Sequence, residues 1–144
     1  MQTILLIRHA KAEERETWTK DDDLRPLTKA GHRQALAFAT NWGADDIKTI
    51  RSSPAVRCVQ TVQPLAERAN VPIITDNSLM EGSKVRLPPL ESTGLHIICA
   101  HGDNIPWLLD EFQIKWKECR KGSTWIVKRD SNGRVVESRY MPPP

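Results

Sequence analysis

The chain has 144 residues, of which 27% are charged and 39% hydrophobic, and its formal net charge is +3. This composition excludes a disordered chain, and the length suffices for one domain with a hydrophobic core. There is no dense Lys/Arg stripe, and no apolar run approaches the roughly 20 residues of a membrane helix. We therefore expect a cytoplasmic protein that forms a single domain over residues 1–144, with neither a nucleic-acid partner nor a membrane span.

The three cysteines, Cys58, Cys99 and Cys119, are odd in number and have no C-x-x-C spacing. This pattern indicates neither a disulfide framework nor a zinc site. We expect free thiols in a reducing compartment.

Short apolar runs predict strands along the whole chain. They are Gln2–Ile7, Ile47–Ile50, Val71–Thr75 and Leu95–Ala100, followed by a hairpin of Trp125–Lys128 and Arg134–Val136 around an Asn-Gly turn. The first run is continuously apolar, as in a strand covered on both faces, and is expected to lie inside the sheet.

Three helices are predicted between these strands. They begin at Thr28, at Ser53 with Pro54, and at Asn104 with Pro106. Pro64 is expected to kink or restart the second helix.

The alternation of strands and helices predicts an α/β fold. We expect a three-layer α/β/α sandwich with a mostly parallel central sheet and a C-terminal β-hairpin. In such sheets ligands bind beyond the carboxyl ends of the strands. The candidate site residues are therefore the polar residues that follow strands, namely Arg8, His9, Ser53, Arg57, Glu81 and His101. The other two histidines, His32 and His96, do not follow strands and are expected to be structural or surface residues.

Four motifs in order resemble those of the histidine phosphatase superfamily, also called phosphoglycerate-mutase-like. The family's R-H-G turn is present as Arg8-His9-Ala10, and L-T-x-x-G-x-x-Q-A spans residues 27–35. S-x-x-x-R-x-x-Q-T spans residues 53–61, and a late strand ends in His-Gly at residues 101–102. The resemblance covers most of the chain and implies a phosphoglycerate-mutase-like fold.

The resemblance further implies phosphoryl transfer through a phosphohistidine on His9. A neutral imidazole is a good nucleophile when it is held in the right tautomer. Arg8, Arg57 and His101 would bind the equatorial phosphate oxygens, where the planar guanidinium donates paired hydrogen bonds. Because the arginines supply the positive charge, neither a metal nor another cofactor is expected.

Two further residues are expected to support this reaction. Ser53, at a helix start, would add a hydrogen-bond donor to the phosphate. Glu81 is the candidate general acid for the leaving group and the general base that activates water.

Two features depart from the family pattern. Ala10 replaces the usual glycine, which is expected either to narrow the approach to the phosphate or to require a negative φ. The stretch 83–94 is short, although many relatives carry a helix or a lid there. We therefore expect no lid domain and an open site, which argues against a mutase because a mutase must keep its phosphorylated intermediate from water.

Two branches of the family are similar to this chain. One is the phosphohistidine protein phosphatases of the SixA type, and the other is the phosphatase domain attached to some bacterial Nudix hydrolases. The second branch is similar to this chain also in the alanine at position 10, and this resemblance would imply a nucleotide di- or triphosphate as the substrate. Our first hypothesis is a phosphatase of small phosphorylated metabolites or nucleotides, and the alternative substrate is a phosphohistidine protein.

Other function classes lack their motifs. No cysteine has the C-x-x-x-x-x-R spacing of cysteine phosphatases. An aspartate-based phosphatase would have D-x-D directly after an apolar strand, but Asp21 and Asp23 lie in a polar loop. The P-loop of nucleotide hydrolases is also missing. The non-enzyme alternative is a decayed phosphate-binding or partner-docking module. The presence of both histidines, Arg8 and Arg57 counts against it.

Overall fold

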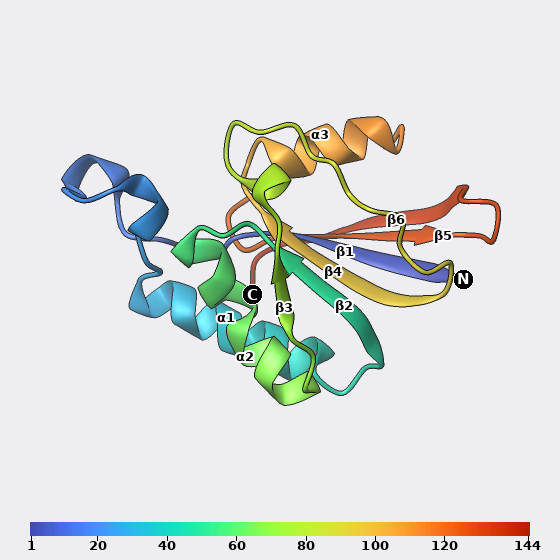
Figure 1. Ribbon diagram of the computed structural model, residues 1–144, viewed down its shortest axis with the longest axis horizontal. Helices are drawn as coiled ribbons and strands as arrows, with labels where there is room; N and C mark the ends of the chain where they lie inside the picture. Colours follow the sequence, from blue (N-terminus) through green and yellow to red (C-terminus); the bar gives the residue numbers. More distant parts are fainter.

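A six-stranded sheet forms the centre of the molecule, in the order β3-β2-β4-β1-β5-β6 (Figure 1). The computed structural model describes all 144 residues. The strands are β1 (Gln2–Arg8), β2 (Ile47–Ser52), β3 (Ile73–Thr75), β4 (Gly94–Ala100), β5 (Thr124–Arg129) and β6 (Val135–Met141). Strands β1 to β4 run parallel, whereas β5 is antiparallel to both β1 and β6. The predicted mostly parallel sheet with a C-terminal hairpin is confirmed.

Helices cover both faces of the sheet. Figure 1 shows α1 (Lys29–Trp42) and α2 (Val56–Ala69) on one face, and α3 (Asn104–Glu111) with the loop of residues 76–93 on the other. The predicted three-layer sandwich is therefore confirmed. None of the helices is both long enough and apolar enough to cross a membrane.

Strand β1 separates two hydrophobic cores. Because successive side chains of a strand point to opposite faces, Leu5 and Ile7 join a cluster of 15 buried residues beneath α1 and α2. Ile4 and Leu6 join a cluster of 12 buried residues beneath α3. These four side chains are fully buried, which confirms the prediction of an interior strand covered on both faces.

The start and the course of α2 differ from the prediction. The helix begins at Val56, and the residue before it, Ala55, makes no side-chain cap, so Ser53 is not its N-cap. Pro64 lies inside the helix, which continues to Ala69 without a restart. Because Val62 and Leu65 are fully buried on either side of Pro64, packing outweighs the one backbone hydrogen bond that a proline removes.

The two edge strands differ most from the prediction. Strand β3 was expected to be buried over Val71–Thr75, but it has only three residues, and Ile74 is 39% exposed. Strand β6 continues five residues beyond the predicted end at Val136, to Met141. Each strand pairs on one side only, so the burial that produces a readable hydrophobic pattern is missing there.

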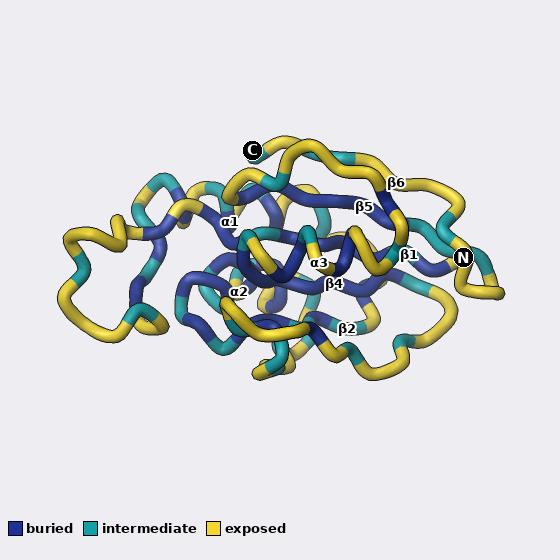
Figure 2. The backbone as a smooth tube through the Cα atoms, turned by 90° about the horizontal axis from the view of Figure 1, so that it is seen from above, coloured by how far each residue is buried: buried dark blue, intermediate teal, exposed yellow.

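Residues 13–25, which connect β1 to α1, form a projecting loop that we call the 13–25 segment. Its base is closed by an isolated antiparallel bridge between Ala12 and Leu27. It contains two 3₁₀ turns, Arg15–Thr17 and Asp22–Leu24, neither of which includes a buried residue. Figure 2 shows this segment as a largely exposed extension, whereas the strands beside it are buried. It lies next to the carboxyl ends of the strands, where the candidate site residues were predicted.

Candidate active site

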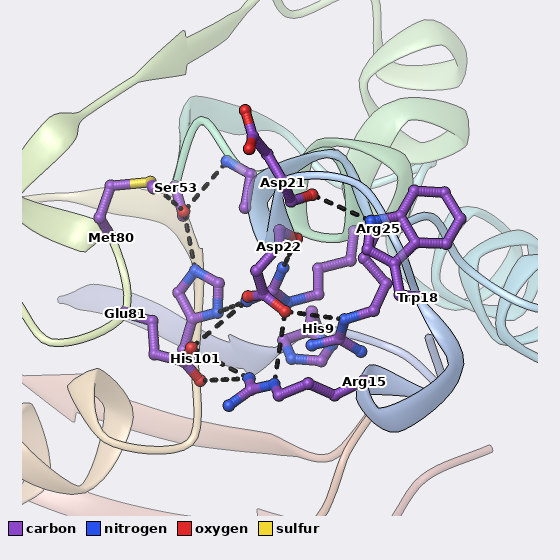
Figure 3. A network of polar contacts seen from close by, with 12 residues as sticks. His9, Arg15, Trp18, Asp21, Asp22, Arg25, Ser53, Met80, Glu81 and His101 are labelled. Atoms are coloured by element: carbon purple, nitrogen blue, oxygen red, sulfur yellow. Dashed lines mark hydrogen bonds and ion pairs between the residues drawn. The ribbon is translucent and has the colours of Figure 1, made fainter. Parts of the chain in front are cut away.

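The two candidate catalytic histidines follow adjacent strands at equivalent positions. Arg8, the last residue of β1, is paired with Ala100, the last residue of β4. His9 and His101 therefore immediately follow paired strand ends. The backbone N–H of His9 donates to the carbonyl of Ala100 at 3.0 Å. The ring centroids are 5.5 Å apart, with the planes inclined at 67°. The sheet itself thus sets the spacing of the two rings (Figure 3).

His9 is buried and is held in one tautomer. Its Nδ1 lies 2.8 Å from the carbonyl oxygen of Ala10, which can only accept a hydrogen bond, so Nδ1 carries the proton and Nε2 keeps its lone pair. Burial, together with nearby His101, Arg57 and Arg8, lowers the pKa of His9 from 6.5 to about 3, although the bond to Ala10 opposes the shift. The ring is therefore neutral near pH 7 and has the electronic form of a nucleophile.

Arg57 is fully buried beside both histidines. Its Nη1 donates to the backbone carbonyl of Asp22 at 2.8 Å, and its Nη2 donates to Oδ2 of Asp22 at 3.0 Å. Nη2 also lies 3.3 Å from Nδ1 of His101. Its Nε is buried without a hydrogen-bond partner. The predicted phosphate-binding arginine is thus in the site and is paired with a carboxylate that was not predicted.

Arg8 reaches the site from the end of β1. Its Nη1 donates to the carbonyl of Cys119 at 2.7 Å, and its Nε is also buried without a partner. A Cβ at Gly102 would lie 2.7 Å from Cζ of Arg8. The guanidinium of Arg8 occupies the space that a side chain at position 102 would need. This explains why glycine follows His101 in the His-Gly motif.

Ser53 orients His101. Its hydroxyl lies 2.9 Å from Nε2 of His101 and donates to Sδ of Met80 at 3.3 Å, so it accepts from Nε2–H. This assignment leaves Nδ1 of His101 to accept from Arg57. The backbone N–H of Ser53 is used as well, because it donates to the carbonyl of Cys99. Both donors of Ser53 thus have partners within the protein, so the predicted donation to phosphate stays a prediction and requires the hydroxyl to leave Met80.

Glu81 lies at the entrance of the site, on the loop that follows β3. Its two oxygens accept hydrogen bonds from Nη2 of Arg15 at 3.0 and 3.1 Å, and Oε2 is 3.6 Å from Nη2 of Arg57. The next residue, Gly82, donates its N–H to the carboxylate of Asp103 at 2.7 Å, which ties this loop to the start of α3. The structure thus brings Glu81 to the site, as predicted, with Arg15 as its partner.

Asp22, Arg15 and Arg25 belong to the site but were missed in the sequence. The carboxylate of Asp22 is 3.0 Å from Nε of Arg25 and 3.3 Å from Nε of Arg15 (Figure 3). Arg25 is only 4% exposed although it lies in a polar loop. The sequence offered one signal, the spacing of three residues between Asp22 and Arg25 shortly before the L-T motif. This spacing did not indicate that Asp22 pairs with Arg57, which is 35 residues away from it in the chain.

The remaining family motif residues support the turn that carries His9. Oγ1 of Thr61 accepts from the backbone N–H of Ala10 at 2.9 Å, and Oε1 of Gln34 accepts from that of Lys11 at 3.0 Å. A Cβ at Gly31 would collide with the carbonyl of Lys11, so α1 can approach the turn only with glycine there. The residues of the L-T-x-x-G-x-x-Q-A and Q-T motifs thus form a scaffold of hydrogen bonds and close contacts around the turn that carries His9.

Ala10 is accommodated without backbone strain. It is not among the residues with positive φ, so the second of the two expected consequences, a negative φ, is the one observed. Its methyl group packs in a small cluster with Ala12, Leu27 and Ala35. The side chain therefore adds to the packing beneath α1.

The expectation of an open site is wrong. There is no lid domain, as predicted, but His9 is only 4% exposed, and Arg57 and His101 are fully buried. The 13–25 segment supplies the cover through Asp22 and Arg15, and Glu81 completes it from the opposite side (Figure 3). The expectation rested on residues 83–94 alone, whereas the cover comes from a different part of the chain.

All three cysteines are free, as expected. No group of three or more His, Cys, Asp or Glu side chains is arranged to hold a metal ion. The arginines at the site are Arg8, Arg15, Arg25 and Arg57.

Comparison with known proteins identifies the family. The profile of the histidine phosphatase superfamily (branch 1) matches residues 4–87. The chain belongs to this superfamily.

Individual relatives agree with this assignment. The chain is 33% identical, over 99% of its length, to 49% of an 8-oxo-(d)GTP phosphatase of Mycolicibacterium smegmatis. It is 35% identical, over 56% of its length, to 42% of a 2,3-bisphosphoglycerate-dependent phosphoglycerate mutase of Thermoplasma acidophilum. The chain thus spans less than half the length of these curated relatives.

The fold is that of the protein histidine phosphatase SixA. The structure of SixA complexed with tungstate superposes with a TM-score of 0.82, covers 98% of this chain and 97% of SixA, and shares 19% identity. At this identity the likeness concerns the fold alone.

Proposed function

We propose that the protein is a phosphatase that cleaves a phosphate ester or anhydride of a small metabolite or nucleotide through a phosphohistidine on His9. The observation that carries this proposal is the neutral, buried ring of His9, whose Nδ1 is bonded to Ala10 and whose Nε2 lone pair is free. Residues 1–144 would act as one catalytic domain. A cytoplasmic location fits the free cysteines.

In the first step, Nε2 of His9 attacks phosphorus while the bond to the leaving oxygen breaks. Negative charge spreads over the equatorial oxygens, where Arg8 and Arg57 would stabilise it. Both arginines have a buried Nε without a partner, so neither guanidinium has all of its donors satisfied within the protein. No metal ion is needed in this scheme.

Glu81 is proposed to move the protons. It would protonate the leaving oxygen in the first step and, as a carboxylate, accept a proton from the water that attacks the phosphohistidine. Inorganic phosphate then leaves, and His9 returns to its neutral form. Because both oxygens of Glu81 are bonded to Arg15, this work requires Arg15 to release it. A leaving group that needs little protonation, such as a nucleoside phosphate, can depart even while Glu81 stays bonded to Arg15, so such substrates suit this site best.

The relative named as an 8-oxo-(d)GTP phosphatase supports a nucleotide as the substrate, since its 33% identity extends over 99% of the chain. A phosphohistidine protein is the second candidate, supported by the likeness of the fold to SixA. A protein substrate would have to present its phosphohistidine to a nucleophile that is only 4% exposed. A small molecule meets this requirement more easily.

The test compares the wild type with His9→Ala on an aryl phosphate, a panel of nucleotides and a phosphohistidine protein. We expect His9→Ala to reduce turnover at least about 10⁴-fold, the scale on which loss of a catalytic nucleophile acts. His32→Ala is the matched control, because His32 is exposed on α1. Rapid quenching should trap an acid-labile phosphoenzyme in the wild type and in His32→Ala only.

Two outcomes would contradict the proposal. Turnover that survives in His9→Ala would rule out the phosphohistidine route. Absence of turnover by the wild type on every substrate class would instead favour a phosphate-binding or docking module.

A further inference from the structure

The buried guanidinium of Arg57 already holds an anion of the protein. Two oxygens of Asp22, the backbone carbonyl and Oδ2, accept from Nη1 and Nη2 of Arg57 at 2.8 and 3.0 Å. Phosphate oxygens bind arginine through the same paired arrangement. In this structure Asp22 therefore occupies the edge of Arg57 that a phosphoryl group would use.

The segment that carries Asp22 is held mainly by polar contacts. Neither of its 3₁₀ turns has a buried residue, and its base is closed by the bridge between Ala12 and Leu27. Beyond this base, two ion pairs tie it to the site, one from Asp22 to Arg57 and one from Arg15 to Glu81. The Arg15–Glu81 pair is exposed and therefore weak, whereas the Asp22–Arg57 pair has a buried arginine and a partly exposed carboxylate. With no buried residue in either 3₁₀ turn, displacing the segment costs less than moving a packed strand, provided that Arg57 keeps a counter-charge.

An anion beside Arg57 is required for electrostatic reasons. A buried guanidinium without a counter-charge is strongly destabilising. Arg57 is fully buried, and its neighbour Arg25 is nearly so. Although partial burial raises it, the pKa of the Asp22 carboxyl is lowered overall by Arg25, Arg57 and Arg15, so the group is ionised at neutral pH. The other carboxylate near Arg57 is Glu81, whose Oε2 is 3.6 Å from Nη2 and does not hydrogen-bond to it. Asp22 can therefore leave Arg57 at low cost only when another anion takes over its two hydrogen bonds.

We propose that Asp22 is a specificity-determining residue that occupies the phosphate position on Arg57 and must be displaced by the phosphoryl group of the substrate. The inference rests on the phosphate-binding role proposed for Arg57. Displacement moves the 13–25 segment, which uncovers His9 at the same time. Binding of an anion and access to the nucleophile are thereby coupled.

This exchange favours some anions over others. A dianionic phosphoryl group offers more charge to Arg57 than the single carboxylate it replaces, and it gains Arg8 as a second partner. A monoanion, such as a phosphodiester or a carboxylate metabolite, offers no such surplus. Inorganic phosphate, the product, must also compete with Asp22, so it binds less tightly than the arginines alone would allow and leaves more readily.

The experiment measures the dissociation constant of inorganic phosphate, by calorimetry, for the wild type, Asp22→Asn and the matched control Asp23→Asn. Asp23 is the adjacent, exposed residue of the same 3₁₀ turn. Asparagine keeps the shape of the side chain and removes its charge. We expect Asp22→Asn to bind phosphate about tenfold more tightly, the scale of one charge-assisted hydrogen bond, and Asp23→Asn to match the wild type.

The coupling to Arg57 is tested with Arg57→Gln and the double variant Asp22→Asn/Arg57→Gln. Without the guanidinium, the change at Asp22 should no longer tighten phosphate binding. With an aryl phosphate as substrate, Asp22→Asn should lower KM more than it changes kcat. Because phosphate binding needs no turnover, the inference can be tested even if the proposed hydrolysis fails.

Unchanged or weaker phosphate binding by a folded Asp22→Asn would overturn the inference and make Asp22 a residue that only positions Arg57. If Asp22→Asn does not fold, Arg15→Gln replaces it, because it removes the other tie of the segment. The same direction, tighter phosphate binding, is then expected. Weaker binding by this variant would equally count against displacement.

Discussion

The two sides of the active site are built by different means. On one side, His9 and His101 continue adjacent parallel strands, and their positions follow from backbone pairing and from two hydrophobic cores. On the other side, Asp22 and Arg15 lie on an exposed segment and reach the site through ion pairs. Packed strands resist displacement, whereas the Arg15–Glu81 pair is exposed, weak and screened by salt, and the carboxylate of the Asp22–Arg57 pair is partly exposed. The rigid side can therefore supply the chemistry while the weakly held side controls access.

The largest expected effect on the rigid side comes from acid. Folding lowers the pKa of His9 from 6.5 to about 3, so between these values the unfolded chain binds the extra proton and stability is lost as the pH falls. Through His9 alone, the free energy of unfolding should drop by about 2–3 kcal/mol from about pH 7.5 to about pH 4.5, with almost all of the loss below pH 6.5.

Urea denaturation of the wild type and of His9→Gln at both pH values measures this effect. The wild type should lose more stability on acidification than the variant, and His32→Gln should behave like the wild type. Equal acid sensitivity of all three proteins would show that His9 is not held neutral by burial.

A smaller effect is expected from Gly102→Ala, which places a methyl group 2.7 Å from Cζ of Arg8. The guanidinium must move, and phosphate affinity should fall about tenfold. Gly133→Ala is the contrasting control, because a Cβ there meets nothing within 4 Å but φ is +80°. Gly133→Ala should lower the free energy of unfolding by about 1 kcal/mol, measured by urea denaturation, and leave the phosphate affinity unchanged, measured by calorimetry. Equal phosphate affinities in the two variants would contradict the role assigned to Gly102.

The smallest of these effects is expected from Thr61→Val. Oγ1 of Thr61 donates to the carbonyl of Arg57 and accepts from the N–H of Ala10, so valine leaves a buried donor unpaired. We expect a loss of about 1 kcal/mol in the free energy of unfolding. Thr40→Val, which removes the analogous bond to Leu36 on the exposed side of α1, should change it by less than about 0.5 kcal/mol. A comparable loss in both variants would mean that the turn after β1 is not specially supported.

The contrast between the two sides also explains what could be predicted from the sequence. Gln2–Ile7 and Leu95–Ala100 were readable as strands because burial on both faces leaves a continuous apolar run. His9 and His101 were found because each directly follows such a run. Arg57 and Glu81 were found by the same rule a few residues beyond their strands, and the structure places both at the site.

The errors concern residues whose partners are distant in the chain. Ser53 was expected to donate to phosphate, but here its hydroxyl donates to Met80, 27 residues away, and accepts from His101, 48 residues away. Asp22 and Arg25 were read as loop residues, because an exposed segment has no periodic pattern that reveals which buried group it covers. For the same reason the closed site was not foreseen.

The register between β1 and β4 has a consequence for how such a protein can change. Since the separation of His9 and His101 is a property of neighbouring strands, it does not depend on the length or composition of the connections between helices and strands. The exposed residues of 13–25 and 76–93, apart from Glu81, can be exchanged for other sequences while His9 and His101 keep their geometry, provided that the buried Leu79 and Val85 are kept. New substrates are therefore accessible by loop grafting, with the sheet left as it is.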